Sequence, residues 1–250
     1  MGLRLQTLQI VARLIEPKPA RREALFVEAL YTLRLTEVLR AHAVNCVLDV
    51  GANRGQFAKR LRNCGYTDWI VSFEPIPELY QHLQRIAQAD GRWQVHPFAL
   101  GSVAGATTFH ITAQDDFSSM LEPNAYAQQT FGLTARASRD ITVEVRRLES
   151  MLGEFDSRLQ TSRYFLKLDT QGFDLEVFKG LGARQGSLAG IQSELSLIPI
   201  YKGMPSMYVA LETYQAAGYG ITGLYPVNVE PSTGRVIEYD CILVPSAGRM

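Results

Sequence analysis

The sequence predicts an α/β protein with a Rossmann-like fold, in which a mostly parallel, seven-stranded sheet ends in an antiparallel C-terminal hairpin. From Val44 onward, strand-sized apolar runs alternate with segments of helical periodicity. Repeated βα units of this kind build a parallel sheet with helices on both faces. The last two strand-like segments, 221–227 and 236–244, are separated by a turn at residues 231–234, which is typical of a hairpin.

The residues before Val44 are expected to form an N-terminal helical extension (residues 1–43) ahead of the main domain (residues 44–250). The segment from Leu3 to Ile15 is rich in apolar residues but is interrupted by arginines, and no cleavage-site pattern follows it. We therefore interpret it as an amphipathic helix that packs on the domain, with weak peripheral contact to a membrane as the alternative. A second helix is expected from Arg21 to Ala41, and no apolar run is long enough to span a membrane.

The first half of the domain alternates regularly between strands and helices. Strands are expected over residues 44–50, 69–74 and 93–99, and helices over residues 56–63 and 77–89. Gly65 follows the first of these helices and Pro77 begins the second, and both residues favour these positions.

An insertion interrupts the alternation at about residues 101–147. Strands over residues 105–112 and 141–145 flank a polar loop that contains Asp115-Asp-Phe-Ser-Ser-Met120. A long connection inside a compact domain is commonly functional. The alternation then resumes, with strands expected over residues 164–169 and 191–197 and helices over residues 174–180 and 206–217.

The charge balance and the cysteines restrict the classes of function. Lys and Arg together number 25, as do Asp and Glu, so the formal net charge is zero. A protein that binds the nucleic-acid backbone needs a basic surface, so we expect no nucleic-acid partner. The three cysteines form no Cys-x-x-Cys pair, and Cys46 and Cys241 fall in expected core strands, which indicates a reducing, cytoplasmic location.

A glycine turn follows the first strand, and a second strand then ends on a carboxylate, which is the layout of a nucleoside-binding βαβ unit. A dinucleotide site carries a further glycine where Asn53 stands here. Asp49 would repel a phosphate, and it suits a ligand with an amino group and no phosphate, such as S-adenosylmethionine. Gly51 allows the tight turn, and Gly55 lets the helix pack close to its strand. We therefore expect S-adenosylmethionine as the cofactor, bound by Asp49, Gly51, Ala52, Asn53, Gly55 and Phe57.

The ends of the second and third strands complete the expected cofactor site. Glu74 can accept hydrogen bonds from both ribose hydroxyls, and Pro75 lies beside it in the sequence. Ala99 and Leu100 follow the third strand, where apolar side chains suit a flat adenine ring. The alternatives are a solvent-facing strand end for Glu74 and ordinary core packing for Ala99 and Leu100.

Lys167 and Asp169 form a charged pair within and at the end of an otherwise apolar strand. They alternate with Leu168 and so share one face of the strand. Buried charges are unfavourable unless they are paired or functional. A structural ion pair is one interpretation, and the other places Asp169 beside the transferable methyl group, with Lys167 holding Asp169 or orienting the substrate.

These motifs resemble the FkbM-type family of S-adenosylmethionine-dependent O-methyltransferases, which has a class I, Rossmann-like fold. The residues that carry the resemblance are Val47 to Phe57, Ser72 to Pro75, Ala99 to Gly101, Phe117 to Met120, Phe165 to Gly172 and Glu238 to Leu243. The family usually has Glu-Gly where this chain has Gln171-Gly172, so a carboxylate role at position 171 does not carry over. The resemblance implies methylation of a hydroxyl, often on a sugar of a glycolipid, polysaccharide or natural product.

A sugar hydroxyl is a poor nucleophile, so a general base should accelerate the transfer by about 10²–10⁴-fold. Asp169 is the first candidate and Glu194 the second, while His110 in the insertion is a weaker candidate because a lone strand histidine is more often structural. Asp169 and Glu194 could offer oxygen ligands to magnesium, but two carboxylates are few, and metal-free chemistry is favoured.

Two loops are candidate walls for a small-molecule or glycan acceptor. Ser118 and Ser119 lie in the insertion, and Tyr201, which follows the fifth strand, could offer a ring face to a sugar. Ordinary surface loops are the alternative. Two other classes of function also stay open, an NAD-binding oxidoreductase and a non-catalytic nucleoside-binding module, and the sequence names neither the acceptor nor the oligomeric state.

Overall fold

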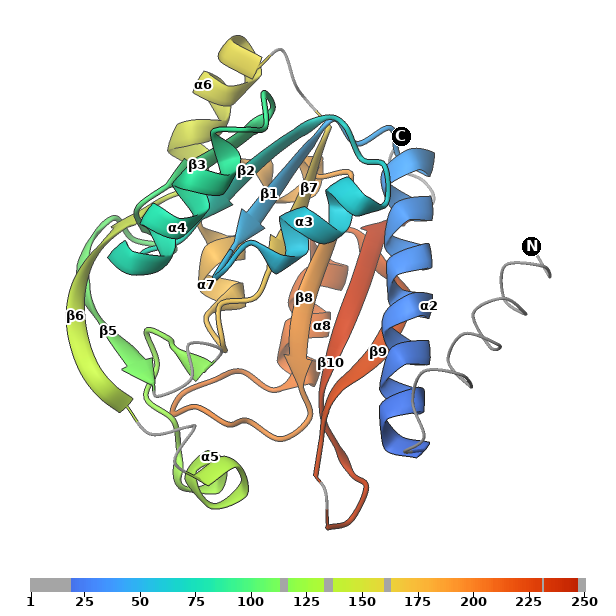
Figure 1. Cartoon of the computed structure of the whole chain (residues 1–250), viewed down its shortest axis with the longest axis vertical. Helices are drawn as coiled ribbons and strands as arrows, with labels where there is room; N and C mark the ends of the chain where they lie inside the picture. Colours follow the sequence, from blue (N-terminus) through green and yellow to red (C-terminus); the bar gives the residue numbers. More distant parts are fainter. Residues whose placement is uncertain (1–18, 113–116, 133–136, 160–162, 231, 247–250) are drawn as a thin grey trace.

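The computed structural model describes residues 19–112, 117–132, 137–159, 163–230 and 232–246. Its main sheet has seven strands in the order β3-β2-β1-β7-β8-β10-β9 (Figure 1). The strands are β1 (Cys46–Val50), β2 (Trp69–Phe73), β3 (Trp93–His96), β7 (Tyr164–Leu168), β8 (Gly190–Ser196), β9 (Tyr219–Val229) and β10 (Val236–Pro245). β10 runs antiparallel to both of its neighbours, and the other pairs are parallel. The predicted α/β class and the closing hairpin are therefore confirmed.

Helices cover both faces of this sheet because successive residues of its central strands point to opposite sides. In β1, Leu48 belongs to one core cluster and Val47 to another. The cluster around Leu48 includes residues of α6 (Glu149–Leu159), α7 (Asp174–Lys179) and α8 (Met207–Ala216). The cluster around Val47 includes residues of α2 (Pro19–Ala41), α3 (Gln56–Asn63) and α4 (Pro77–Ala87). The result is the doubly wound arrangement that repeated βα units predict.

The insertion forms a second sheet, which curves away at one side of the molecule (Figure 1). Its three strands are ordered β4-β6-β5 and comprise β4 (Ala99–Leu100), β5 (Gly105–Thr112) and β6 (Ala137–Arg146). Phe109 and Val143 of this sheet pack with Ile76 and Leu79 at the start of α4. This packing brings the insertion over the carboxyl ends of β1 and β2.

Some element boundaries differ from the sequence predictions. The third strand was expected over residues 93–99, but β3 ends at His96 and Ala99 pairs with β6 instead. Pro97 lies at the break, where its ring removes a backbone donor that a continuing strand would need. The short helix α5 (Ala125–Phe131) and the helix α6 were not predicted.

Two predicted segments lie outside the residues that the structure describes, so the structure does not test them. These are the amphipathic segment from Leu3 to Ile15 and Asp115-Asp116 of the insertion. Within the part of the chain that the structure describes, no helix is both long enough and apolar enough to cross a membrane. The division into an extension (residues 1–43) and a domain (residues 44–250) stays a prediction.

Candidate active site

A pocket of about 400 Å³ lies at the carboxyl ends of the central strands. Ligands of open α/β sheets bind at this edge, and a volume of this order suits a small organic molecule. The pocket is lined by the turn after β1, the segment after β2, the turn after β7 and the end of β8. Residues of the insertion and of β9 close it. The lining includes Gly51, Asn53, Gln56, Glu74, Pro75, Ile76, Leu79, Ala99, Leu100, Phe109, Asp169, Gln171 and Glu194.

The glycine turn at the pocket depends on Gly51, which adopts a left-handed conformation that other residues rarely adopt. Gly51 has φ of 74°, and a β-carbon there would lie 1.9 Å from the carbonyl oxygen of Asp169. The turn is held from its other side, since the N–H groups of Gly51 and Ala52 both donate to the carbonyl oxygen of Phe73. The turns after β1 and β7 therefore lie in direct contact at the pocket floor.

Gly55 does not have the expected packing partner. A β-carbon on Gly55 would lie 2.7 Å from Leu83 and 3.0 Å from Trp93, so this glycine allows α3 to approach α4 and β3 rather than its own strand. Gly55, Ala52 and Phe57 are absent from the pocket lining. The predicted direct contacts of these three residues with a cofactor are therefore not supported by the geometry.

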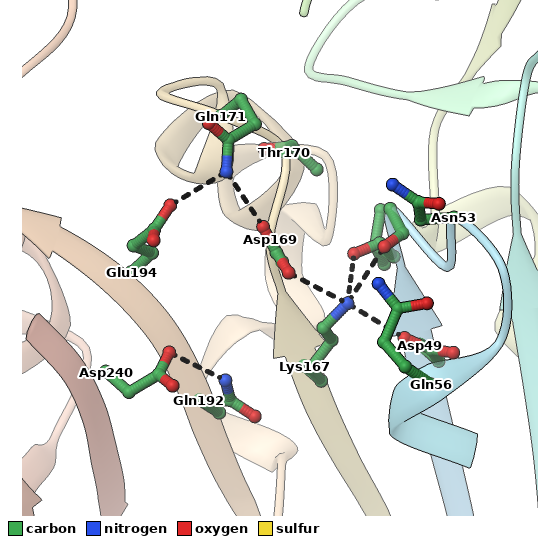
Figure 2. A network of polar contacts seen from close by, with 12 residues as sticks. Asp49, Asn53, Gln56, Lys167, Asp169, Thr170, Gln171, Gln192, Glu194 and Asp240 are labelled. Carbon is green, nitrogen blue, oxygen red and sulfur yellow. Dashed lines mark hydrogen bonds and ion pairs between the residues drawn. The ribbon is translucent and has the colours of Figure 1, made fainter. Parts of the chain in front are cut away.

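Asp49 is buried beneath the pocket and does not line it, contrary to the expectation of a cofactor contact. The register of β1 against β7 pairs Asp49 with Lys167, so both side chains lie on the same face of the sheet. Their nitrogen and oxygen atoms are 3.0 Å apart (Figure 2). The hydroxyl of Ser72 also donates to Asp49, over 3.0 Å. Asp49 therefore holds a buried cation and does not meet a ligand amino group.

Lys167 connects the two turns at the floor of the pocket. Its ammonium donates to the carbonyl oxygen of Gly51 over 2.9 Å and lies 3.5 Å from a carboxylate oxygen of Asp169. Burial lowers the pKa of Lys167, but the nearby Asp49 and Asp169 carboxylates outweigh this effect and raise the pKa above its ordinary value. Lys167 also lies 5.5 Å from the ring centre of Phe57. It does not line the pocket, so of its two predicted roles the geometry favours holding Asp169.

Glu74 lies in the pocket wall, as predicted, and its carboxylate is already oriented by the backbone. Oε2 accepts from the N–H of Asn53 over 2.8 Å, and Oε1 accepts from the N–H of Ile76 over 2.9 Å. Burial raises the pKa of Glu74 to about 7, although both backbone N–H groups act to lower it. A carboxylate offers about four acceptor sites, so two are left for hydroxyl groups of a ligand.

The wall beyond Glu74 is apolar, and it includes the two residues that were expected beside an adenine ring. Ala99 and Leu100 line the pocket, and so do Ile76 and Leu79. The sequence reasoning did not anticipate Ile76 and Leu79. Ile76 directly precedes α4, and Leu79 lies in its first turn. Their position just after Glu74-Pro75, at the end of the second strand, could have indicated that they line the pocket.

Asp169 and Glu194 face the pocket from neighbouring strand ends, as the sequence predicted. The side chain of Asp169 is 41 % exposed. Burial and then the charges of Glu238 and Asp169 raise the pKa of Glu194 well above its ordinary value. The carboxamide of Gln171 lies between the two carboxylates (Figure 2).

Asp174 positions this part of the site, and the sequence reasoning assigned it no role. One oxygen accepts from the backbone N–H and the hydroxyl of Thr170, over 3.0 and 2.6 Å. The other accepts from the hydroxyl of Ser193 and the N–H of Glu194, over 2.8 and 3.2 Å. Asp174 thus fixes the turn after β7 to the end of β8. A carboxylate at the first position of a short helix was the available signal.

The predicted acceptor-loop residues divide into one that lines the pocket and two that do not. Ser118 lines the pocket. Ser119 and Tyr201 are buried behind it, at 0 % and 2 % exposure, so Tyr201 offers no open ring face to a sugar. His110 is also outside the pocket lining, and its Nδ1 lies 2.8 Å from Asp140. The expectations for Ser119, Tyr201 and His110 as direct contacts are corrected accordingly.

Several other pocket residues come from distant segments that the sequence did not connect with the site. Phe109 belongs to the insertion, and Val227 and Asn228 belong to β9. Phe117 and Met120 also line the pocket, and both lie in the insertion loop that the sequence analysis proposed as a wall of the site. Among the described residues, no group of three or more His, Cys, Asp or Glu side chains is arranged to hold a metal ion.

The fold and the pocket define a Rossmann-like protein with the carboxylate of Glu74 at one wall of the pocket and those of Asp169 and Glu194 at another. Over residues 49–220, more than half of the chain, the sequence matches the family model described as the methyltransferase FkbM domain. The chain therefore belongs to the FkbM methyltransferase family. The predicted class of S-adenosylmethionine-dependent methyltransferase is confirmed, which removes the NAD-binding oxidoreductase and the non-catalytic module as alternatives.

Solved structures with a similar fold include three methyltransferases. Magnesium protoporphyrin IX methyltransferase from Synechocystis PCC 6803, with bound SAM, is 10 % identical, with 92 % of this chain and 86 % of that chain covered and a TM-score of 0.46. An rRNA methylase from Streptococcus thermophilus is 10 % identical, with 87 % of this chain and 95 % of that chain covered and a TM-score of 0.44. Precorrin-6y C5,15-methyltransferase from Geobacter metallireducens is 12 % identical, with 82 % of this chain and 81 % of that chain covered and a TM-score of 0.41. No curated protein matches the sequence of this chain.

Proposed function

We propose that this chain transfers the methyl group of S-adenosylmethionine to a hydroxyl group of a sugar in a glycolipid, polysaccharide or natural product. The observation that carries the proposal is one pocket with Glu74 in one wall and the Asp169–Glu194 pair in another. The first wall suits a nucleoside, and the second suits removal of a proton from an attacking hydroxyl. The family membership supplies the reaction class.

The residues of the pocket fit the proposed cofactor. Glu74 keeps acceptor sites for the ribose hydroxyls, and Leu100 with Ile76 provides an apolar surface for the adenine ring. The first N–H groups of a helix have no partner within it, and Gln56, the first residue of α3, lines the pocket, so the methionine carboxylate would be favoured at this helix start. Asp169 is the exposed carboxylate beside this turn, so it replaces Asp49 as the partner we propose for the positive end of the cofactor.

The two carboxylates have different surroundings, which suggests different roles. When bound, the cofactor would supply a methyl group on a sulfonium, and the neutral thioether that departs is a good leaving group. The chain then has to position the acceptor hydroxyl and take its proton, and positioning alone can lower a barrier by roughly 7–11 kcal/mol. Burial raises the pKa of Glu194 above its ordinary value, so its ionised form is a stronger base than an exposed glutamate and is suited to take the hydroxyl proton. Asp169, ion-paired with Lys167, is better suited to face the sulfonium.

The acceptor would enter beside β9, where Val227 and Asn228 line the same pocket as Glu194. Asn228 offers hydrogen-bonding groups and Val227 an apolar contact, a combination that suits a sugar. The formal net charge of zero favours such an acceptor over a nucleic acid. The free cysteines Cys46, Cys64 and Cys241 favour a reducing compartment, so we propose a cytoplasmic location. We propose metal-free chemistry, with magnesium at Asp169 and Glu194 as the alternative.

Two measurements test the proposal in sequence. Calorimetric titration with S-adenosylhomocysteine and with NAD tests the cofactor, and tighter binding of NAD would contradict the proposal. Release of S-adenosylhomocysteine is then measured with a panel of deoxysugars and glycolipids. Glu194→Gln should lower kcat by about 10²–10⁴-fold with little change in S-adenosylhomocysteine affinity. If Asp169→Asn shows that pattern and Glu194→Gln does not, the two roles are exchanged. Chelation that abolishes turnover, with recovery on adding magnesium, would contradict metal-free chemistry.

A further inference from the structure

The carboxamide of Gln171 joins the two carboxylates of the pocket. Its amide nitrogen donates to Oδ1 of Asp169 over 3.1 Å and to Oε2 of Glu194 over 3.0 Å (Figure 2). An amide NH₂ has two hydrogens, so both donations can be made at once. Its oxygen, Oε1, accepts from the hydroxyl of Tyr201 over 2.7 Å. All polar atoms of this side chain are therefore engaged.

These partners determine which way the amide faces. Rotating it by half a turn would place its oxygen against Asp169 and Glu194, where two acceptors would meet unless a carboxyl group were protonated. The same rotation would remove the acceptor that Tyr201 uses. The contact with Tyr201 thus favours the orientation in which the NH₂ group meets both carboxylates.

The backbone of Gln171 is held in an uncommon conformation. Its φ is 53°, in the left-handed region that residues other than glycine rarely adopt. The hydroxyl of Ser119, from the insertion, donates to the carbonyl oxygens of Gln171 and Thr170, over 2.8 and 3.3 Å. The turn therefore directs the Gln171 side chain back toward the strand end that it follows.

The electrostatic surroundings of the pair are mostly acidic. The charged and titratable groups that interact with Asp169 or Glu194 include Lys167, Asp174, Glu238, Asp240, Tyr31 and Tyr201. Lys167 forms an ion pair with Asp169, whereas the Glu194 carboxylate accepts a hydrogen bond from Gln171. Donation to a carboxylate favours its ionised form.

We propose that Gln171 is a positioning residue of the methyl transfer, whose amide holds Asp169 and Glu194 together at the pocket wall and offsets the repulsion between them. This inference rests on the proposed function, because it assigns both carboxylates to the reaction. Gln171 acts through these two groups, and the neutral amide is essential to that role. A carboxylate at this position would add a third negative charge and remove both donors.

The test compares two ligands that differ in charge at one atom. S-adenosylmethionine carries a sulfonium and S-adenosylhomocysteine a neutral thioether, so the ratio of their affinities reports negative charge near the sulfur. Because the ribose and adenine are common to both, contributions from Glu74 largely cancel. Calorimetry from pH 5 to pH 9 would give this ratio for the wild type, Gln171→Glu, Gln171→Met and Tyr201→Phe. Gln215→Glu, on the exposed face of α8, adds a carboxylate elsewhere and is the matched control.

The wild type should prefer S-adenosylmethionine at high pH and lose that preference as the pair takes up a proton. In Gln171→Glu and Gln171→Met the midpoint, which is the pH at which half of this preference is lost, should rise by about one unit, because the ionised Asp169 and Glu194 carboxylates have lost their amide donors. Tyr201→Phe should move the midpoint in the same direction by less, and Gln215→Glu should not move it. Coincident midpoints in the wild type and both Gln171 variants would overturn the inference. Failure of the wild type to bind either ligand would instead contradict the proposed function.

Once an acceptor is identified, the same variants separate positioning from binding. Gln171→Met should lower kcat while changing the acceptor KM little, and the acid limb of its pH–rate profile should move to higher pH. Equal melting temperatures of Gln171→Glu and the wild type would show that the shift does not come from unfolding. An unchanged kcat and pH profile in Gln171→Met would also overturn the inference.

Discussion

The carbonyl oxygen of Asp169 occupies the space that a side chain on Gly51 would need, 1.9 Å from an ideal β-carbon position. Gly51→Ala should therefore separate the two turns and abolish detectable binding of S-adenosylhomocysteine in calorimetry. Overpacking of this kind typically costs about 1–3 kcal/mol of stability. Gly65→Ala is the matched control, because Gly65 also has a positive φ, of 86°, but nothing lies within 4 Å of its β-carbon position. Equal loss of affinity in both variants would show that backbone conformation, and not the contact, is responsible.

Removing one partner of the buried ion pair between Lys167 and Asp49 should strongly destabilise the protein. Lys167→Met leaves the Asp49 carboxylate buried without its cation, and breaking a buried pair in this way typically costs about 3–5 kcal/mol. The double variant with Asp49→Asn removes both charges and should recover part of the loss. Guanidinium unfolding of the two single variants and the double variant would measure this. Strictly additive changes in the free energy of unfolding would contradict a direct interaction.

The affinity for S-adenosylhomocysteine should depend on pH through Glu74. Burial raises the pKa of this carboxyl to about 7, so the protonated form accumulates as the pH falls below 7. Protonation removes an acceptor that the ribose hydroxyls need, so affinity should weaken in that range. Glu74→Gln should show a flat pH response and an affinity about 10- to 100-fold weaker, because hydrogen bonds to charged groups contribute about 1.5–3 kcal/mol. A wild-type affinity that is constant from pH 5 to pH 8 would contradict this assignment.

Glu238 should make the protein more stable at mildly acidic pH. It is fully buried, and burial raises its pKa above the value in the unfolded chain. A group with a raised folded-state pKa contributes stability below its unfolded pKa and loses it as the pH rises through the folded pKa. The melting temperature should therefore fall from pH 5 to pH 8. In Glu238→Gln this slope should be smaller, since the amide does not titrate and Asn228 can rotate to accept from it. An unchanged slope would rule out Glu238 as its source.

Ser119 should matter for stability although it does not line the pocket. Ser119→Ala removes the donor to Gln171 and Thr170 and the acceptor of the Leu121 N–H. Groups left unsatisfied in this way cost about 1–3 kcal/mol. For a chain of this size that corresponds to roughly 2–4 °C in melting temperature for each kcal/mol. Ser157→Ala, which removes an exposed hydroxyl on α6, is the control and should leave the melting temperature unchanged. Equal melting temperatures for both variants would contradict the structural role of Ser119.

The parts of the site that the sequence predicted are those that depend on local pattern. The helix over residues 56–63 was predicted with the bounds that α3 has, and Glu74 was placed in the pocket wall from its distance to the glycine turn. Asp169 and Glu194 were placed at the same edge because parallel strands end together. Turn chemistry and strand periodicity are encoded by neighbouring residues, so these features needed no long-range information.

The partner of each polar side chain was decided by the tertiary structure. The sequence predicted Asp49 as a cofactor contact because Asp49 lies just before the glycine turn. Its actual partner, Lys167, is set by the register of β1 against β7, which the local sequence does not reveal. The sequence predicted an exposed Tyr201 ring that could contact a sugar, whereas in the structure this residue is buried and donates a hydrogen bond to Gln171. By itself, the sequence determined the class of fold, the strand ends that form the site and the nucleoside signature of the turn. Register and burial arise from contacts between distant segments, so the tertiary structure alone decided which of those residues face the pocket and which support it.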